Sequence, residues 1–312
     1  MVEIFFKTLP FFAIIGLGYI AAWWKFFSSE ATVYLTKFVF YFALSAMIFQ
    51  FSAKLNLSEF LSWNFVFAYL GASVSVYCIG FVVGLMRGIP VSQAAVEAQC
   101  CTIGNVGFLG IPMLAILLGP QAIGYVMIIL AVDLIVFGSL IVLLILGSKE
   151  GKINFSILKN LFMGLLKNPM IMAIVTGILW SILELPLPGP LWEFVTLLGA
   201  ASTPCALFAI GASLVAKTTE RIQTAVWISF VKLVIHPLAV AGMALLIFEI
   251  DDYAASVMIV ASALPIAGNI YILAEHYQVA PQRVSTSILV STIVSIFSVS
   301  LVMSLAGSSI NF

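Results

Sequence analysis

Two short motifs interrupt apolar stretches, one in each half of the chain, and they carry the groups best suited to bind a solute. Proline lacks an amide hydrogen and clashes with the preceding turn, and glycine permits backbone geometries that other residues resist. Each motif is therefore expected to split a helix near its middle. The residues concerned are Gly104, Asn105, Gly107 and Pro112 in the first motif, and Pro265, Gly268 and Asn269 in the second.

A broken helix inside an apolar span predicts a binding site. Backbone groups released from a helix in hydrocarbon persist only inside protein or beside a wet cavity. The N-terminus of each half-helix offers free amide protons and the positive end of a dipole, which favours an anion. Asn105 and Asn269 add neutral donors and acceptors that suit a carboxylate. Both asparagines also fit the role of helix caps, which is compatible with binding. The prolines and glycines are expected to shape the backbone.

Four ionisable residues fall within apolar stretches and are candidates for coupling to an ion. They are Glu97, Asp133, Lys232 and His236. A charge at mid-membrane costs roughly 2.5–3.5 kcal/mol on insertion scales, so such groups pair or face a cavity. An Asp133–Lys232 pair would be either a structural ion pair or a proton- or cation-coupling element, and the sequence leaves both open. His236 fits a satisfied interior histidine as well as a proton carrier.

The composition defines the elements that must position these residues. Of 312 residues, 63% are hydrophobic and 8% are charged, whereas soluble domains carry roughly 25% charged residues. This predicts an all-helical protein that crosses the membrane many times. Stretches of about 20 apolar residues suit spanning helices. The ten predicted spans are Ile4–Trp24, Ala31–Ala53, Ser62–Met86, Gln93–Leu118, Gln121–Leu146, Asn168–Leu183, Pro190–Ala216, Ile222–Phe248, Ala254–Glu275 and Pro281–Ala306.

The net charge, the cysteine spacing and the absence of certain motifs argue against several function classes. A net charge of zero speaks against nucleic acid as a partner. The four cysteines show neither a disulfide framework nor metal-ligand spacing. The segment 147–152 is one residue short of a phosphate loop and lacks its Ser or Thr, so ATP drive is unsupported. No enzyme motif was found, and no cofactor is expected beyond a coupled proton or sodium ion.

Lysine and arginine in short loops set the orientation of membrane proteins. Most of these residues fall on one predicted side: Lys25, Arg87, Lys149, Lys152, Lys159, Lys167, Lys217, Arg221 and Arg283. The other side holds Lys54 and Lys7, and an acidic group at Glu249, Asp251 and Asp252. The bias places the central linker in the cytoplasm and both termini outside it.

The two halves of the chain align along their length. Lys7-Thr8-Leu9-Pro10 parallels Lys167-Asn168-Pro169, and Pro120-Gln121 parallels Pro281-Gln282. Because each half holds five spans, an odd number, the second copy enters from the other face, which predicts an inverted repeat. The expected domains are residues 1–150, a cytoplasmic linker at 151–167, and residues 168–312.

Three segments resemble the auxin efflux carrier family, which includes plant auxin carriers and bacterial organic-acid permeases. They are residues 104–112, residues 203–214, and the stretch from Ala263-Leu264-Pro265 to Ser285-Thr286. The resemblance implies crossing broken helices four and nine, a transport domain that moves as an elevator, and a scaffold of helices 1, 2, 6 and 7 that forms a homodimer. It also implies a carboxylate-binding role for Asn105. Ser45 departs from the family, whose members often have proline there.

The leading functional hypothesis is secondary transport of small organic anions across the inner (plasma) membrane by alternating access. The short linker favours a bacterial type of permease over an auxin carrier. A sodium-coupled symporter resembling the bile acid symporters is one alternative. A non-transporting membrane sensor is another, and tight binding without counterflow would favour it.

Overall fold

The computed structural model describes residues 2–54, 60–150, 155–186, 188–215 and 222–307, and within these ranges it consists of helices joined by short turns and loops. Their one extended pairing is an isolated antiparallel bridge between Gly104 and Ile266. Seven helices are long and apolar enough to cross a membrane, and the number is eight if one bent pair is taken as a single span. The predicted class, an all-helical protein with many membrane spans, is confirmed.

The seven long helices coincide with predicted spans one, two, three, five, seven, eight and ten. They cover Phe5–Trp23, Ser29–Ser52, Trp63–Met86, Ala122–Ser148, Gly189–Ser213, Ile222–Ile247 and Pro281–Ala306. The predicted sixth span is a bent pair, Leu161–Lys167 and Pro169–Ile182, with a 66° bend at Asn168. Asn168 caps the second member through hydrogen bonds to the amides of Met170 and Ile171. The predicted fourth and ninth spans are interrupted.

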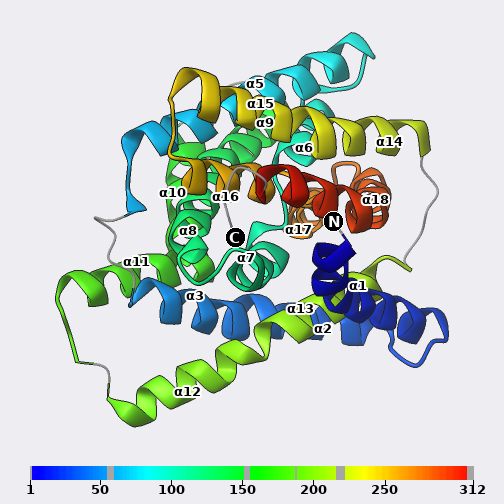
Figure 1. Ribbon diagram of the computed structural model, residues 1–312. Helices are drawn as coiled ribbons and strands as arrows, with labels where there is room; N and C mark the ends of the chain where they lie inside the picture. The colour runs from blue at the N-terminus through cyan, green and yellow to red at the C-terminus, as the bar shows by residue number, and fades with distance from the viewer. Residues whose placement is uncertain (1, 55–59, 151–154, 187, 216–221, 308–312) are drawn as a thin grey trace.

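The helices form two layers (Figure 1). The lower layer in that view contains α1 (Val2–Trp23), α2 (Ser29–Phe38), η1 (Val39–Ala43), α3 (Leu44–Ser52), α11 (Pro169–Ile182), α12 (Gly189–Ala200) and α13 (Ser202–Ser213). In this layer α1 packs along α13, and α3 packs against α11 and α12. The helices α1 and α13 approach closely because Gly18 lies on Phe208 and Gly211 lies on Ile15.

The second layer carries the interrupted spans. It consists of α5 (Trp63–Met86), α6 (Val91–Thr102), α8 (Ala122–Val132), η3 (Asp133–Phe137), α9 (Gly138–Glu150), α14 (Ile222–Phe230), η4 (Val231–Ile235), α15 (His236–Gly242), η5 (Met243–Ile247), α16 (Asp252–Ser262) and α18 (Pro281–Gly307). Three further segments, η2 (Val106–Gly110), α7 (Ile111–Leu117) and α17 (Asn269–Tyr277), continue the broken spans. Of these, η2 reaches the first layer and contacts α13.

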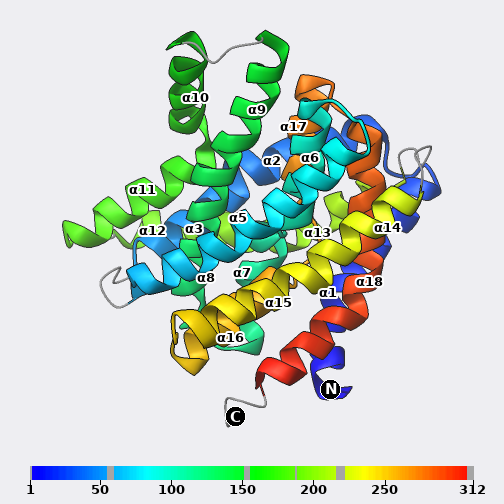
Figure 2. The same ribbon diagram turned by 90° about the horizontal axis from the view of Figure 1, so that it is seen from above.

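The start of α1 and the end of α18 lie at one end of the molecule, and α10 (Phe155–Lys167) lies at the other beside α9 (Figure 2). This arrangement puts the chain ends and the central linker at opposite ends. Residues 151–154 of the predicted linker lie outside the described residues, and the remainder, 155–167, forms α10. Lys152, Lys217 and Arg221, used above for orientation, also lie outside the described residues.

Candidate functional site

The two interrupted spans cross at their breaks. Helix α6 ends at Thr102 and the helix resumes at Val106, while α16 ends at Ser262 and α17 begins at Asn269. The amide of Asn105 donates to the carbonyl of Pro265 at 2.8 Å, and the amide of Ala267 donates to the carbonyl of Ile103 at 3.1 Å. Backbone groups released by each break therefore find partners in the other, as burial requires.

Proline sets the local helix geometry next to two functional segments. Pro112 lies at the start of α7, directly after the π-helical turn η2. Pro237 lies at the start of α15, directly after the π-helical turn η4. A proline removes the amide that would close the regular helical bond, so a wider turn before it is a natural accommodation. Pro112 thus shapes the continuation of span four rather than its interruption.

Small residues let the breaks approach other groups. A Cβ atom on Gly104 would lie 3.2 Å from Nζ of Lys232. A Cβ atom on Gly110 would lie 2.8 Å from a methyl carbon of Leu264. Glycine at these two positions therefore allows the lysine to reach the first break and allows the two broken spans to pack together.

A cavity of about 280 Å³ adjoins the crossing and is called the crossing cavity here. Of the predicted solute-site residues, Gly104, Asn105, Gly107 and Asn269 line it. Gly268 lines a second, separate cavity between α2, α13, α17 and α18, and Pro265 contributes its carbonyl to the crossing instead. The cavity walls also include Leu161 and Leu165 of α10, so the cavity extends toward the linker end.

Three acceptor atoms at the crossing cavity lack a hydrogen-bond partner. They are Oε1 of Gln99, Oδ2 of Asp133 and Oδ1 of Asn269. Gln99 and Asp133 are buried residues, 3% and 4% exposed. An unsatisfied buried acceptor is costly and calls for an explanation, of which a bound ligand is one.

The two charges at the centre of the second layer are not paired directly. Asp133 accepts a hydrogen bond from Tyr69 Oη at 2.8 Å. Lys232 donates to the carbonyl of Ser262, at the end of α16, and its Nζ lies 3.0 Å from Nδ1 of His236. Nε2 of His236 lies 3.0 Å from the hydroxyl of Ser73. Of the alternatives left open by the sequence, a direct Asp133–Lys232 ion pair is therefore absent between these two described side chains.

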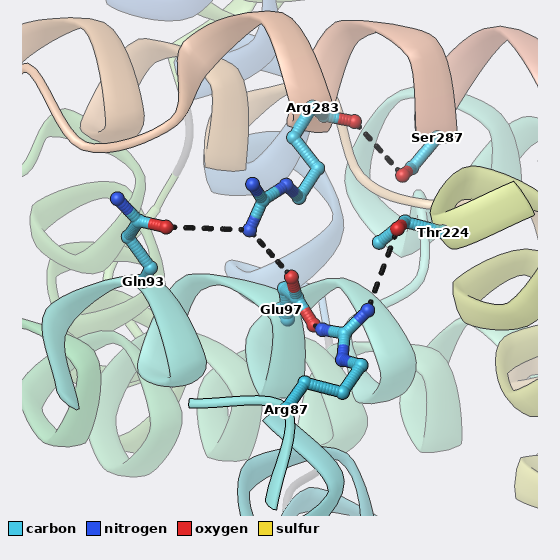
Figure 3. Close-up of polar contacts among 6 residues, drawn as sticks. All are labelled: Arg87, Gln93, Glu97, Thr224, Arg283 and Ser287. Atoms are coloured by element: carbon cyan, nitrogen blue, oxygen red, sulfur yellow. Dashed lines mark hydrogen bonds and ion pairs between the residues drawn. The ribbon is translucent and has the colours of Figure 1, made fainter. Parts of the chain in front are cut away.

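Glu97 occupies a separate polar cluster near the α5–α6 turn (Figure 3). Its carboxylate binds Arg87 and also accepts from Arg283 at 2.6 Å. Arg283 further contacts Gln93, and Arg87 contacts Thr224. Glu97 does not line the crossing cavity. The cluster joins the end of α5 and helices α6, α14 and α18, so Glu97 holds α6 in place next to the break.

Sequence reasoning missed several residues of the site. Gln99 and Asn168 line the cavity, and Tyr69 and Ser73 support the buried charges. Gln99 could have been predicted from the sequence. Its side-chain amide lies six residues before Asn105 in an otherwise apolar span, and a buried amide must find a partner. The roles of Tyr69 and Ser73 depend on packing between distant helices. Within the described residues, no group of three or more His, Cys, Asp or Glu side chains is suited to hold a metal ion.

The many apolar spans, the crossing of two interrupted helices and the polar cavity beside it define a membrane transport protein rather than an enzyme. A family model described as "Membrane transport protein" matches residues 3–303. The chain belongs to this family of auxin efflux carrier-like membrane transporters.

Three relatives are similar to this chain at low identity. A Rhizobium meliloti (strain 1021) protein named "Putative malonate transporter" is 27% identical over 96% of this chain and 94% of its own length. "Uncharacterized transporter YfdV" of Escherichia coli (strain K12) is 25% identical over 91% of this chain and 92% of its own length. The "Lysosomal cholesterol signaling protein" of Mus musculus is 26% identical over 94% of this chain but 36% of its own length.

Proposed function

We propose that the protein is a secondary transporter of small carboxylates, which bind in the crossing cavity. The observation that carries this proposal is the meeting of the two broken spans beside a cavity that both Asn105 and Asn269 line. Interrupted helices in corresponding positions of two halves are typical of transporter binding sites. The helix that restarts at Val106 has the amides of Gly107 and Phe108 in its first turn, and the N-terminal end of such a helix favours an anion. In α17 the first-turn amides of Ile270 and Tyr271 already donate to the carbonyls of Ala267 and Gly268.

An inverted repeat and an elevator movement of the second layer are part of the proposal. The hydrogen bonds of the crossing support the repeat. The bond between Ile103 and Ala267 and the bond between Asn105 and Pro265 lie on either side of the Gly104–Ile266 pair, and each break supplies one donor and one acceptor. A twofold axis in the membrane plane would produce this arrangement. The two layers of Figure 1 would then be a scaffold and a moving transport domain. The scaffold would form the homodimer, and α12 offers the exposed apolar residues Phe194 and Leu197 for it.

The malonate transporter named among the relatives supports a small acid as the substrate. The cavity volume of about 280 Å³ is near the small end of ligand sites, which also favours a compact molecule. We place the protein in the inner (plasma) membrane, with the linker end of the crossing cavity in the cytoplasm.

We further propose a proton rather than sodium as the coupling ion. The cation at the crossing is Lys232, whose Nζ contacts the Ser262 carbonyl at the end of α16. Carbonyls at such a break are the ligands that a sodium ion would use. The ammonium group of Lys232 would occupy the place of such an ion, and Asp133, with one buried oxygen that lacks a hydrogen-bond partner, is the group that would respond to pH.

Replacement of the two asparagines tests the proposal. Asn105→Ala and Asn269→Ala should each lower carboxylate counterflow in proteoliposomes by about tenfold, since each removes a hydrogen-bonding partner of the solute. Asn64→Ala is the matched control, because Asn64 is exposed at the start of α5. Wild-type counterflow by both cavity variants, with normal unfolding temperatures, would contradict the assigned site. Tight carboxylate binding without any counterflow would favour a sensor.

A further inference from the structure

The polar groups of the crossing cavity have an uneven distribution of charge. Among the described residues that line it, none is lysine, arginine or histidine, and one, Asp133, is acidic. Lys232 lies next to Gly104, and its Nζ contacts the carbonyl of Ser262 and Nδ1 of His236. A ligand therefore meets one region of positive potential, at the break, and one carboxylate across from it.

Three residues that line the cavity each have a buried acceptor atom without a hydrogen-bond partner. Oδ2 of Asp133 and Oε1 of Gln99 are buried without a donor, and Oδ1 of Asn269 adds a third such atom. When Asp133 has released its proton, its carboxylate accepts hydrogen bonds and cannot donate one. A second negative charge on the ligand placed here would face Asp133 without a neutralising cation, and burying such a pair is unfavourable. A hydrogen-bond donor on the ligand would satisfy these atoms.

We infer that the transported species is a monoanion with a hydrogen-bond donor at its far end: a hydroxy acid, or a short dicarboxylic acid with one carboxyl group protonated. This rests on the proposed function and specifies its substrate class. The ionised carboxylate lies at the first-turn amides of the break, next to Lys232, and the donor points to Asp133 and Gln99. The site with Asp133 ionised rejects a fully ionised dicarboxylate.

A pair of isosteric monoanions tests the donor directly. Malonamate carries an NH2 group where acetoacetate carries a methyl group, and both have one carboxylate. In counterflow of labelled malonate in proteoliposomes, malonamate should compete at least about tenfold more strongly than acetoacetate, the factor expected when buried acceptors lose their donor. Equal competition by the two compounds would overturn the inference.

The charge state of the substrate is tested by pH. Labelled malonamate is the reference substrate, because it stays a monoanion at neutral pH. Dividing the malonate flux by the malonamate flux removes the effect of pH on the protein itself. The ratio of malonate flux to malonamate flux should fall as the pH rises through the second ionisation of malonate. A ratio that rises over this range would show that the dianion is carried and would overturn the inference.

A variant links the selectivity to the cavity. Gln99→Leu should reduce the preference for malonamate over acetoacetate at least about threefold, because it removes one of the acceptors. Gln223→Leu, at an exposed position on α14, should retain the wild-type preference. An unchanged preference in Gln99→Leu would remove the assigned contact. A different result would refute the proposed function itself: a wild-type protein that unfolds cooperatively, and is therefore folded, but exchanges no carboxylate at all.

Discussion

At the scale of single residues, the unpaired arrangement of Asp133 and Lys232 is the most informative feature. Each begins or lies within a π-helical turn, η3 or η4, and such turns are frequent at functional sites. A direct ion pair would satisfy both groups at once. Instead Tyr69 binds one oxygen of Asp133, and the other oxygen is buried without a hydrogen-bond partner. Half of the carboxylate therefore remains available to a proton or a ligand.

Neutralising Asp133 should uncouple transport from pH. With malonamate as a substrate whose charge does not change, wild-type flux should depend on pH because Asp133 gains and loses a proton. Asp133→Asn fixes a neutral group there, so the pH profile should become flat, and Tyr69→Phe should shift the profile because the carboxylate loses a donor. The measurement is proteoliposome flux across a series of pH values.

The control for this experiment is Asp252→Asn, since Asp252 is exposed in the first turn of α16. It should keep the wild-type profile. A pH profile in Asp133→Asn that matches the wild type would assign the coupling to another group, and a flux that follows a sodium gradient instead would restore the sodium-coupled alternative.

At the scale of elements, the interruptions in spans four and nine could be predicted from sequence, because glycine and proline act on the backbone locally. The glycine and proline residues also predict where the interruptions lie, which is next to Asn105 and Asn269. The π-helical turns and the bend between α10 and α11 were not predicted, since each depends on how a helix packs against its neighbours. The bond between Tyr69 and Asp133 joins residues on different helices and carries no local sequence signal.

The contact between α1 and α13 should depend on glycine. A Cβ atom on Gly211 would lie 1.8 Å from the backbone oxygen of Ile15, so the two helices would have to separate. Small residues allow such close approach in membranes. Gly211→Ala should lower the unfolding temperature of the detergent-solubilised protein by at least about 3 °C, as overpacking commonly costs 1–3 kcal/mol.

Gly16→Ala is the matched control on α1, because a Cβ atom there has nothing within 4 Å. Its unfolding temperature should stay at or slightly above that of the wild type, since alanine favours a helix more than glycine does. Equal unfolding temperatures for Gly211→Ala and the wild type would mean that α1 and α13 are not in close contact in the membrane-extracted protein.

At the scale of the whole molecule, composition and span length were sufficient to predict a helical membrane protein, whereas the assembly of the spans into two layers was implied by resemblance alone. Hydrophobicity specifies which segments leave water, but it does not say which span packs on which. The layers depend on small-residue contacts such as Gly18 with Phe208 and on the crossing hydrogen bonds.

The orientation of the molecule follows from charge and is testable at its two ends. The α10 end carries Lys159 and Lys167, and the opposite end carries the acidic residues at the start of α16 (Figure 2). The positive-inside rule therefore predicts that α10 lies in the cytoplasm. Single cysteines at Lys159 and Asp252, both exposed positions, report on each end once Cys78, Cys100, Cys101 and Cys205 are replaced by alanine.

In intact cells a membrane-impermeant maleimide should label Asp252→Cys, and it should label Lys159→Cys only after the membrane is permeabilised. The variant without cysteines should remain unlabelled under both conditions. The reverse pattern would place α10, and with it the linker end of the crossing cavity, outside the cell. Because the cavity extends toward α10, that result would also reverse the side to which the binding site is directed in this conformation.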